Sequence, residues 1–333
     1  MTEKTVAEAP YQVSTFKQYR RKFRQLSNST KFWKGMALFA IALIVFSQFY
    51  TISLTVTPKY KLAKKNNIAL NAGETTEFVV DASSLEGQVL PAEGVELPIT
   101  WGDLGKRMND DGVIDDAKFR ALFPEGFKNS EEQIFSGNWD EPVVLTQENS
   151  RFMLDMLWAF GLANKNSILE EGEMMDEQYG GAGNFAATGG WSLAQGPAMD
   201  HYSMHNYVEL SPEQQDMVDS VSRGIYRPCC GNSTHFPDCN HGMAMLGLLQ
   251  LMAADGASEE EMYKVALRVN SYWFPQTYID LATYFEEQGT KWQDVDPQLV
   301  LGAEYSSAQG YQATRQQIQS LPKVPQGGGG CGA

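Results

Sequence analysis

An uncharged apolar stretch near the N-terminus, GMALFAIALIVFSQFYTISLTVTP, constrains this chain more than any other feature. It runs from Gly35 to Pro58, and its most apolar part is Met36–Leu54. A helix needs about 20 consecutive apolar residues to cross the hydrocarbon core of a bilayer. The sequence therefore predicts a single transmembrane anchor over residues 35–57.

Charge is distributed unevenly on the two sides of this stretch. Residues 1–35 contain eight Lys/Arg and two Asp/Glu, and the rest of the chain contains 18 Lys/Arg and 39 Asp/Glu. Because basic residues stay on the cytoplasmic side, we expect the N-terminus in the cytoplasm and the larger C-terminal part outside the cell membrane. No small-x-small cleavage site follows the apolar run, so a single-pass anchor is favoured over a cleaved signal peptide. The acidic body argues against nucleic acid as a partner.

The predicted fold class is mainly α, with the anchor followed by an extracytoplasmic helical domain and a small extended or β segment. The chain divides into a basic cytoplasmic leader (1–34), the anchor (35–57), a tether with short extended segments (58–100), the helical domain (101–322) and a flexible glycine-rich tail (323–333).

Local signals mark helix ends within the helical domain. Ser211 with Gln214 forms a capping-box pattern that predicts a helix to about Gly224. Ser258 with Glu261 repeats the pattern. Gly256 stands where a helix over about residues 240–254 should end.

Soft metal ligands are concentrated in IYRPCCGNSTHFPDCNHGMAM, residues 225–245. This segment holds three of the four cysteines, and all four histidines fall between positions 201 and 241. Thiolate and imidazole are preferred ligands of zinc and copper, and thioether sulfur also favours Cu(I). The pattern therefore predicts a copper or zinc site, copper first.

The predicted ligands are Cys229, Cys230, Cys239, His241, His201 and His205. Weaker candidates are His235, Met204, Met243, Met245, Asp200, which would orient His201 as a hydrogen-bond acceptor, and Cys331 on the glycine-rich tail.

Three geometrical expectations accompany these candidates. Cys239 precedes a predicted helix, whose positive N-terminal end should lower the pKa of the thiol. If PAMDHYSMH is helical, His201, Met204 and His205 share one face. For a single site, His201 or His205 should lie roughly 3–5 Å from a cysteine or from His241.

Several stretches resemble an uncharacterised family of N-terminally membrane-anchored bacterial proteins with a CC…CNHG motif. They are ITWGDLGKRM, NFAATGGWSL and CCGNSTHFPDCNHGMAMLGLLQLM. This resemblance covers most of the outer domain and implies no activity.

Residues 225–272 also resemble the CcmH-like thiol-reductase module of cytochrome c maturation. That module has a cysteine pair, a short loop, a helix ending in Gly-x-Ser-acidic-x-Glu, and a second helix. Here Cys230, GNST, the helix through Met252, GASEEE and MYKVALRVNSYWF follow the same order. The resemblance implies an extracytoplasmic helical hairpin that acts on thiols of haem-binding partners. The family's pair is C-x-x-C, whereas this chain has Pro228-Cys229-Cys230.

Three functions remain open from the sequence. We favour a non-catalytic Cys/His metal-binding protein of the cell envelope, involved in metal handling or redox chemistry. One alternative is a thiol–disulfide oxidoreductase with Cys229 or Cys230 as nucleophile and Cys239 as resolving thiol. The other is a structural module, bridged from Cys239 to Cys229 or Cys230, that docks an envelope protein. No histidine outside the cluster could serve a hydrolase-type triad.

Overall fold

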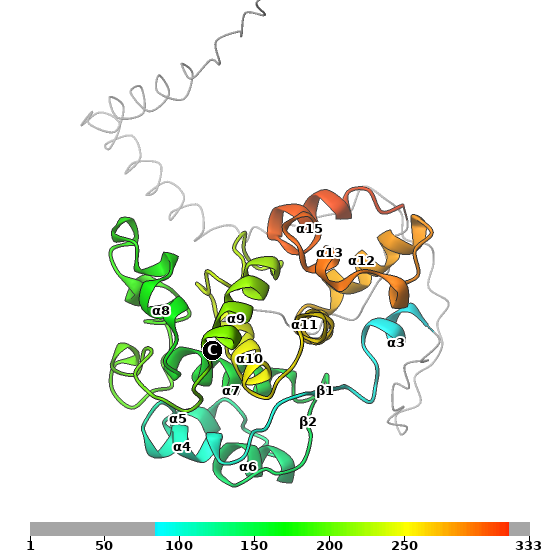
Figure 1. The fold of residues 1–333 in the computed structure, drawn as a ribbon. Coiled ribbons are helices and arrows are strands. Elements are labelled where there is room, and N and C mark those ends of the chain that lie inside the picture. The colour runs from blue at the N-terminus through cyan, green and yellow to red at the C-terminus, as the bar shows by residue number, and fades with distance from the viewer. Residues whose placement is uncertain (1–83, 320–333) are drawn as a thin grey trace, which may run out of the picture. The chain divides into compact units, whose positions relative to one another are not determined.

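Helices dominate the described part of the chain, as the sequence predicts (Figure 1). The computed structural model describes residues 84–319, which all belong to one unit, Thr76–Ala333. The predicted leader, anchor, first part of the tether and glycine-rich tail, including Cys331, lie outside the described residues. Within residues 84–319, no helix is both long enough and apolar enough to cross a membrane.

The secondary structure consists of α-helices, short 3-10 helices and two strands. The α-helices are α3 (Leu85–Val89), α4 (Leu104–Asp110), α5 (Asp116–Ala121), α6 (Asn129–Ser136), α7 (Ser150–Ala163), α8 (Ser167–Glu171), α9 (Pro212–Gly224), α10 (Asn240–Ala254), α11 (Glu259–Trp273), α12 (Pro275–Glu287), α13 (Pro297–Leu301), α14 (Ala303–Ser306) and α15 (Ala308–Arg315). The 3-10 helices are η1 (Glu173–Met175), η2 (Glu177–Tyr179), η3 (Ala182–Asn184), η4 (Ala198–Asp200) and η5 (Trp292–Asp294), and the strands are β1 (Val95–Leu97) and β2 (Val143–Leu145).

Helices α7 and α10 form the centre of the described unit. In α7, 12 of 14 residues are buried, and in α10, 14 of 15 are buried. The two helices cross at Gly161 and Gly247. A Cβ on Gly161 would lie 2.2 Å from the carbonyl oxygen of Met243, and one on Gly247 would lie 2.6 Å from that of Leu157. Only glycine allows the two backbones to approach this closely.

The predicted helix boundaries are confirmed. Ser211 caps α9 through a capping box with Gln214. Ser258 accepts a hydrogen bond from the backbone of Glu261 at the start of α11. Helix α10 covers the predicted range, and Gly256 follows it with a φ of 84°, which a residue with a side chain rarely adopts.

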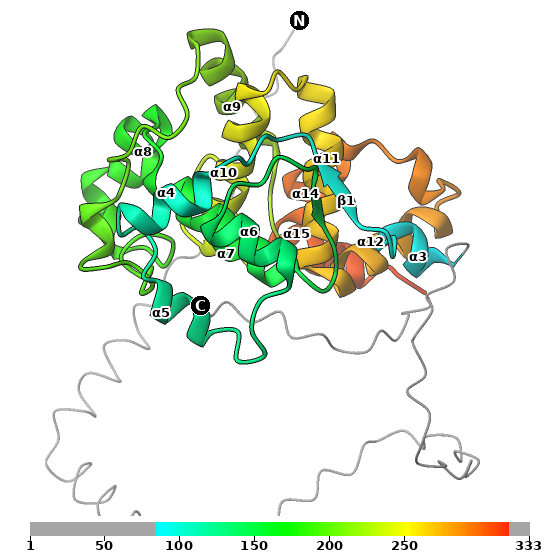
Figure 2. The ribbon, with the colours of Figure 1, turned by 90° about the horizontal axis from the view of Figure 1, so that it is seen from below.

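The two strands form a small antiparallel ribbon in which Val95 pairs with Leu145 and Leu97 with Val143. Strand β1 confirms part of the predicted extended segment, although α3 within the same region is helical. The chain passes from α3 through β1 beside α11 (Figure 2). The side chain of Arg268 on α11 donates to the backbone carbonyl of Gln88, which fastens this segment to the helical core.

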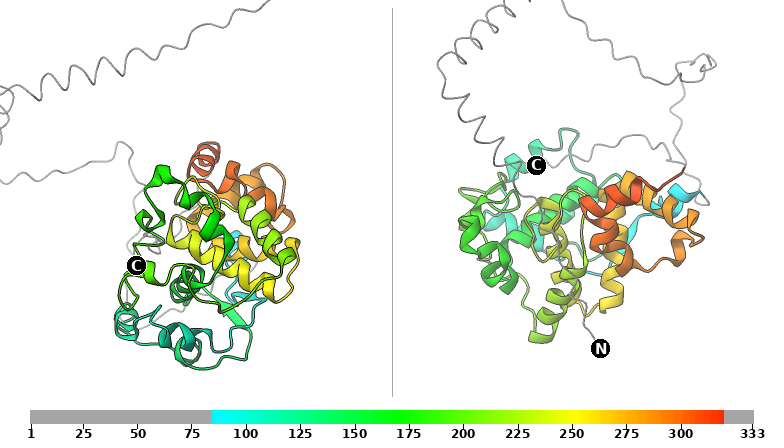
Figure 3. Two further views of the ribbon diagram at one scale, coloured as in Figure 1. Left: turned by 60° about the vertical axis from the view of Figure 1, so that its left-hand side comes forward. Right: turned by 90° about the horizontal axis from the view of Figure 1, so that it is seen from above.

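The helices that follow α11, drawn in orange and red, lie on one side of it, and α4 to α8, drawn in blue-green to green, lie on the other side (Figure 3). Helix α3 lies with the later helices, against α12. The loop between α9 and α10 is held against the later helices. The backbone N–H of Tyr226 donates to Leu301 at 2.8 Å, and that of Ala308 donates to Cys230 at 2.8 Å. These bonds fix the loop that carries Cys229 and Cys230 in front of the N-terminal end of α10.

Candidate metal centre

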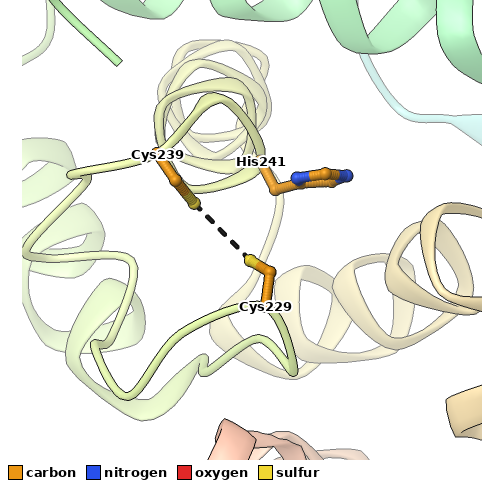
Figure 4. Close-up of side chains that lie close together, drawn as sticks. All are labelled: Cys229, Cys239 and His241. Carbon is orange, nitrogen blue, oxygen red and sulfur yellow. Dashed lines mark hydrogen bonds between the residues drawn. The ribbon is translucent and has the colours of Figure 1, made fainter. Parts of the chain in front are cut away.

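Cys229, Cys239 and His241 come together where the α9–α10 loop meets the start of α10. We call these three side chains the cysteine–histidine group. Cys239 is the N-cap of α10, and His241 follows in its first turn (Figure 4). The sulfur of Cys229 faces that of Cys239 from the loop, 3.6 Å away. One ligand atom from each residue lies within 4.8 Å of the others, as one metal ion requires.

His241 is buried among aromatic rings. Its ring centroid is 4.4 Å from that of Phe274 and 5.7 Å from that of Trp273. The residue is 5% exposed, and its Nδ1 has no hydrogen-bond partner among the described residues. Buried ring nitrogens are normally paired, so this atom has acceptor or donor capacity that the described part of the chain does not use.

Arg227 is the functional residue that sequence analysis missed. It is 1% exposed, and its Nε donates to the sulfur of Cys239 at 3.1 Å. Its Nη2 donates to Asp238 Oδ1 at 2.7 Å and to the carbonyl of Phe236 at 3.1 Å. A signal was present, because Arg227 is the only Lys, Arg, Asp or Glu between positions 224 and 237. Arginine is almost never fully buried unless it is paired, so its burial here depends on partners such as Asp238.

The surroundings shift the pKa values of the thiols of Cys239 and Cys229 in opposite directions. The pKa of Cys239 is held well below its ordinary value, because the thiols of Cys229 and Cys230 donate to it and because Arg227 lies beside it. The pKa of Cys229 is raised by its hydrogen bonds with Cys230 and Cys239. The lowering predicted for Cys239 is therefore confirmed in direction. Its main causes are neighbouring thiols and a guanidinium, which the sequence-based argument from the helix N-terminus did not include.

No disulfide joins the three described cysteines, Cys229, Cys230 and Cys239. The sulfurs of Cys229 and Cys239 are 3.6 Å apart, whereas a disulfide bond is about 2.05 Å long. Cys230 belongs to a different set of side chains from Cys229. With Asp238 and Cys239 it forms a second cluster, which we call the aspartate group, whose ligand atoms also lie within 4.8 Å of one another.

His201 and His205 form a separate pair, which we call the histidine pair. His201 Nδ1 lies 3.1 Å from His205 Nε2, and His201 Nε2 lies 3.2 Å from the carbonyl oxygen of Gln195. His205 Nδ1 is 3.6 Å from Asp111 Oδ2, which also accepts a hydrogen bond from Tyr207. The two histidines thus contact each other, and within the described residues neither joins a ligand group with a cysteine.

PAMDHYSMH does not form the helix on which a shared face of His201, Met204 and His205 depended. Only η4 forms there, and Ser203 has a φ of 54°, which a right-handed helix does not allow. Met204 is consequently turned outward and is 68% exposed. Among residues 84–319, the ring of His201 contacts Gln195 and His205, and Asp200 does not orient it.

The other weaker candidates lie outside the cysteine–histidine group. His235 Nε2 is 2.7 Å from Asp219, and its Nδ1 is 3.7 Å from Glu173. Met243 and Met245 are fully buried in the apolar core. Those two methionines therefore contribute to packing.

Comparisons of this chain with protein-family models, curated proteins and solved structures return no match.

Proposed function

We propose that this chain is an N-terminally membrane-anchored, extracytoplasmic protein that binds a metal ion in the cysteine–histidine group. The observation that carries the proposal is the buried, unpartnered Nδ1 of His241 beside two thiols. An unpaired buried polar atom costs roughly 1–3 kcal/mol. Metal binding at this imidazole would give the ring a partner. Asp155 Oδ2 and the buried Nδ1 of His235 are also unpaired, but neither residue joins a ligand group among residues 84–319.

The distances in the group suit coordination with little movement. Two sulfurs bound to one tetrahedral metal at about 2.3 Å are about 3.8 Å apart. The sulfurs of Cys229 and Cys239 are 3.6 Å apart. Arg227 favours the deprotonated form of Cys239, which is the form that binds metal.

Copper is the first choice of metal and zinc the second. Two thiolates and an imidazole are soft and borderline ligands, which suit both ions. Structural zinc sites almost always take four protein ligands, whereas this group supplies three. The expected physiological partner is another envelope protein that delivers or receives the metal.

A second function is favoured by the same pair of sulfurs. Cys229 and Cys239 are close enough to form a disulfide after a small movement, as a thiol–disulfide oxidoreductase requires. In that function the imidazole of His241 would help to lower the pKa of Cys239, but its buried Nδ1 would still have no partner. It therefore ranks below metal binding, and a disulfide-bridged docking module ranks third because no bridge is formed among the described cysteines.

Elemental analysis of the full-length protein tests the proposal. We expect about one copper or zinc ion per chain after anaerobic purification in detergent. Cys239→Ser and His241→Ala should each lose the ion while helical circular dichroism is retained. His205→Ala is the matched control, because His205 is a ligand-type residue that lies in the histidine pair.

Two results would contradict metal binding at this group. One is a wild-type protein that retains no metal when reducing agent is present throughout. The other is an equal loss of metal in His205→Ala and His241→Ala, which would mean that both histidines bind the metal at one site.

A further inference from the structure

Cys239 belongs to two overlapping groups of ligand-type side chains. On one side it faces Cys229 and His241 in the cysteine–histidine group, and on the other it faces Cys230 and Asp238 in the aspartate group. The sulfur of Cys230 is 3.9 Å from Asp238 Oδ1 and 3.9 Å from the carbonyl oxygen of Asn232. By the nature of the side chains alone, each group could hold one metal ion.

The aspartate group already has a cation. The guanidinium of Arg227 lies 3.1 Å from the sulfur of Cys239 and 2.7 Å from Asp238 Oδ1. Its remaining N–H groups donate to the carbonyls of Phe236 at 3.1 Å and Asn232 at 3.2 Å. Arginine remains charged at all physiological pH values. Arg227 therefore occupies Asp238, which belongs to this group alone, and also contacts the sulfur of Cys239, which the two groups share.

Gly242 provides the space for this charge. A Cβ at position 242 would lie 2.4 Å from both Cζ and Nη2 of Arg227. Glycine inside a helix costs about 1 kcal/mol relative to alanine, yet it occupies the first turn of α10. The helix thus has a glycine where any side chain would displace the guanidinium.

We infer that Arg227, seated against Gly242, blocks the aspartate group and directs metal to the cysteine–histidine group, so that each chain binds one ion. Arg227 acts here as a specificity-determining residue and not as a ligand. The assignment of the occupied group rests on the proposed function. The blocking of the aspartate group rests on the contacts of Arg227 alone.

Stepwise addition of Zn²⁺ to the anaerobic full-length protein tests this inference, because zinc accepts thiolate, imidazole and carboxylate ligands. Bound zinc is measured by elemental analysis after desalting. We expect one ion per chain in the wild type and two in Gly242→Ala and in Arg227→Leu. The second ion should be lost again in Gly242→Ala combined with Cys230→Ser. Gly231→Ala is the control glycine, because a Cβ there meets nothing within 4 Å, and it should bind one ion.

The outcomes separate the two proposals. One ion in the wild type and one in Gly242→Ala and Arg227→Leu, each with native helical circular dichroism, would overturn the blocking role and leave the proposed function intact. No ion in the wild type but one in Gly242→Ala would reject the proposed function and support the blocking role. Absence of zinc from every variant would reject both. If Arg227→Leu does not fold, Gly242→Ala retains the complete ligand set and decides the question.

Discussion

The cysteine–histidine group and the histidine pair are both clusters of metal-ligand side chains, but their atoms are engaged differently. In the histidine pair, three ring nitrogens lie within 3.2 Å of a partner and the fourth lies 3.6 Å from Asp111. In the cysteine–histidine group, a buried ring nitrogen has no hydrogen-bond partner among the described residues. Closeness of ligand-type residues therefore does not identify a metal site by itself. A buried ring nitrogen without a partner distinguishes the cysteine–histidine group from the histidine pair.

The two regions are also separated along α10. The backbone N–H of His205 donates to the carbonyl of Ala163 in α7. The side chain of the next residue, Asn164, donates to the side chain of Gln250 in α10 at 2.9 Å. Gln250 follows His241 by nine residues, which corresponds to about 14 Å of helix. The predicted single site, which would unite the segment of His201 and His205 with the segment of the cysteines and His241, is therefore not the arrangement found.

The largest expected difference between the regions concerns their charged neighbours. Arg227 is 1% exposed, whereas the side chain of Asp111 is 46% exposed. Arg227→Leu should lower the free energy of unfolding of the metal-free protein by about 3–5 kcal/mol, because Asp238 and two carbonyls lose a buried partner. Asp111→Asn should change it by less than about 1 kcal/mol. Urea unfolding of the full-length variants in detergent, followed by circular dichroism, measures both effects.

Equal destabilisation by Arg227→Leu and Asp111→Asn would contradict this difference between the two regions. It would mean that the charge beside the histidine pair is as integral to the fold as the charge beside the cysteines.

An intermediate effect, with opposite signs in the two regions, is expected from replacing histidine by phenylalanine. His241→Phe should raise the stability of the metal-free protein by about 1 kcal/mol, because it removes an unpaired buried atom beside Phe274. His201→Phe should lower stability by about 1–3 kcal/mol, because Gln195 and His205 lose their partner. Thermal unfolding in the presence of a chelator measures both.

Metal content gives an independent check on the same variants. His241→Phe should lose metal although it is more stable, and His201→Phe should keep it. A destabilised His241→Phe would show that the ring nitrogen has a partner in the metal-free state.

The smallest expected effect is the pH dependence of the histidine pair. The pKa of His205 lies below its ordinary value of 6.5, mainly because burial disfavours the charged ring, while Asp111 partly opposes this and His201 adds to it. Below pH 6.5 the unfolded chain binds a proton that the folded chain does not, so His205 lowers stability as pH falls through its folded pKa. Asp111→Asn should lower this pKa further. NMR of labelled imidazole carbons against pH measures it, and a pKa above 6.5 in the wild type would contradict the contacts described.

The sequence predicted those parts of the site that depend on neighbours along the chain. The helix over about residues 240–254 was predicted correctly, with Cys239 directly before it and His241 near its start.

The remaining features depend on contacts between distant segments. The position of the histidine pair is set by the crossing of α7 and α10, which joins Asn164 to Gln250, 86 residues away. Arg227 is buried because the α9–α10 loop brings it against Asp238 and Gly242. Periodicity in the sequence does not predict such contacts. Strand β2 was not predicted either, because its three residues pair with a segment about 50 residues earlier.

The near-complete burial of α10 has a consequence for the rate at which metal could enter and leave. Amide hydrogens in such a helix exchange with solvent only through its rarest openings, whereas turns outside regular structure open more often. Cys239 and His241 lie at the start of α10, which opens rarely, and Cys229 lies on the loop in front of it. Metal exchange should therefore follow the opening rate of the loop and be much faster than unfolding of the protein.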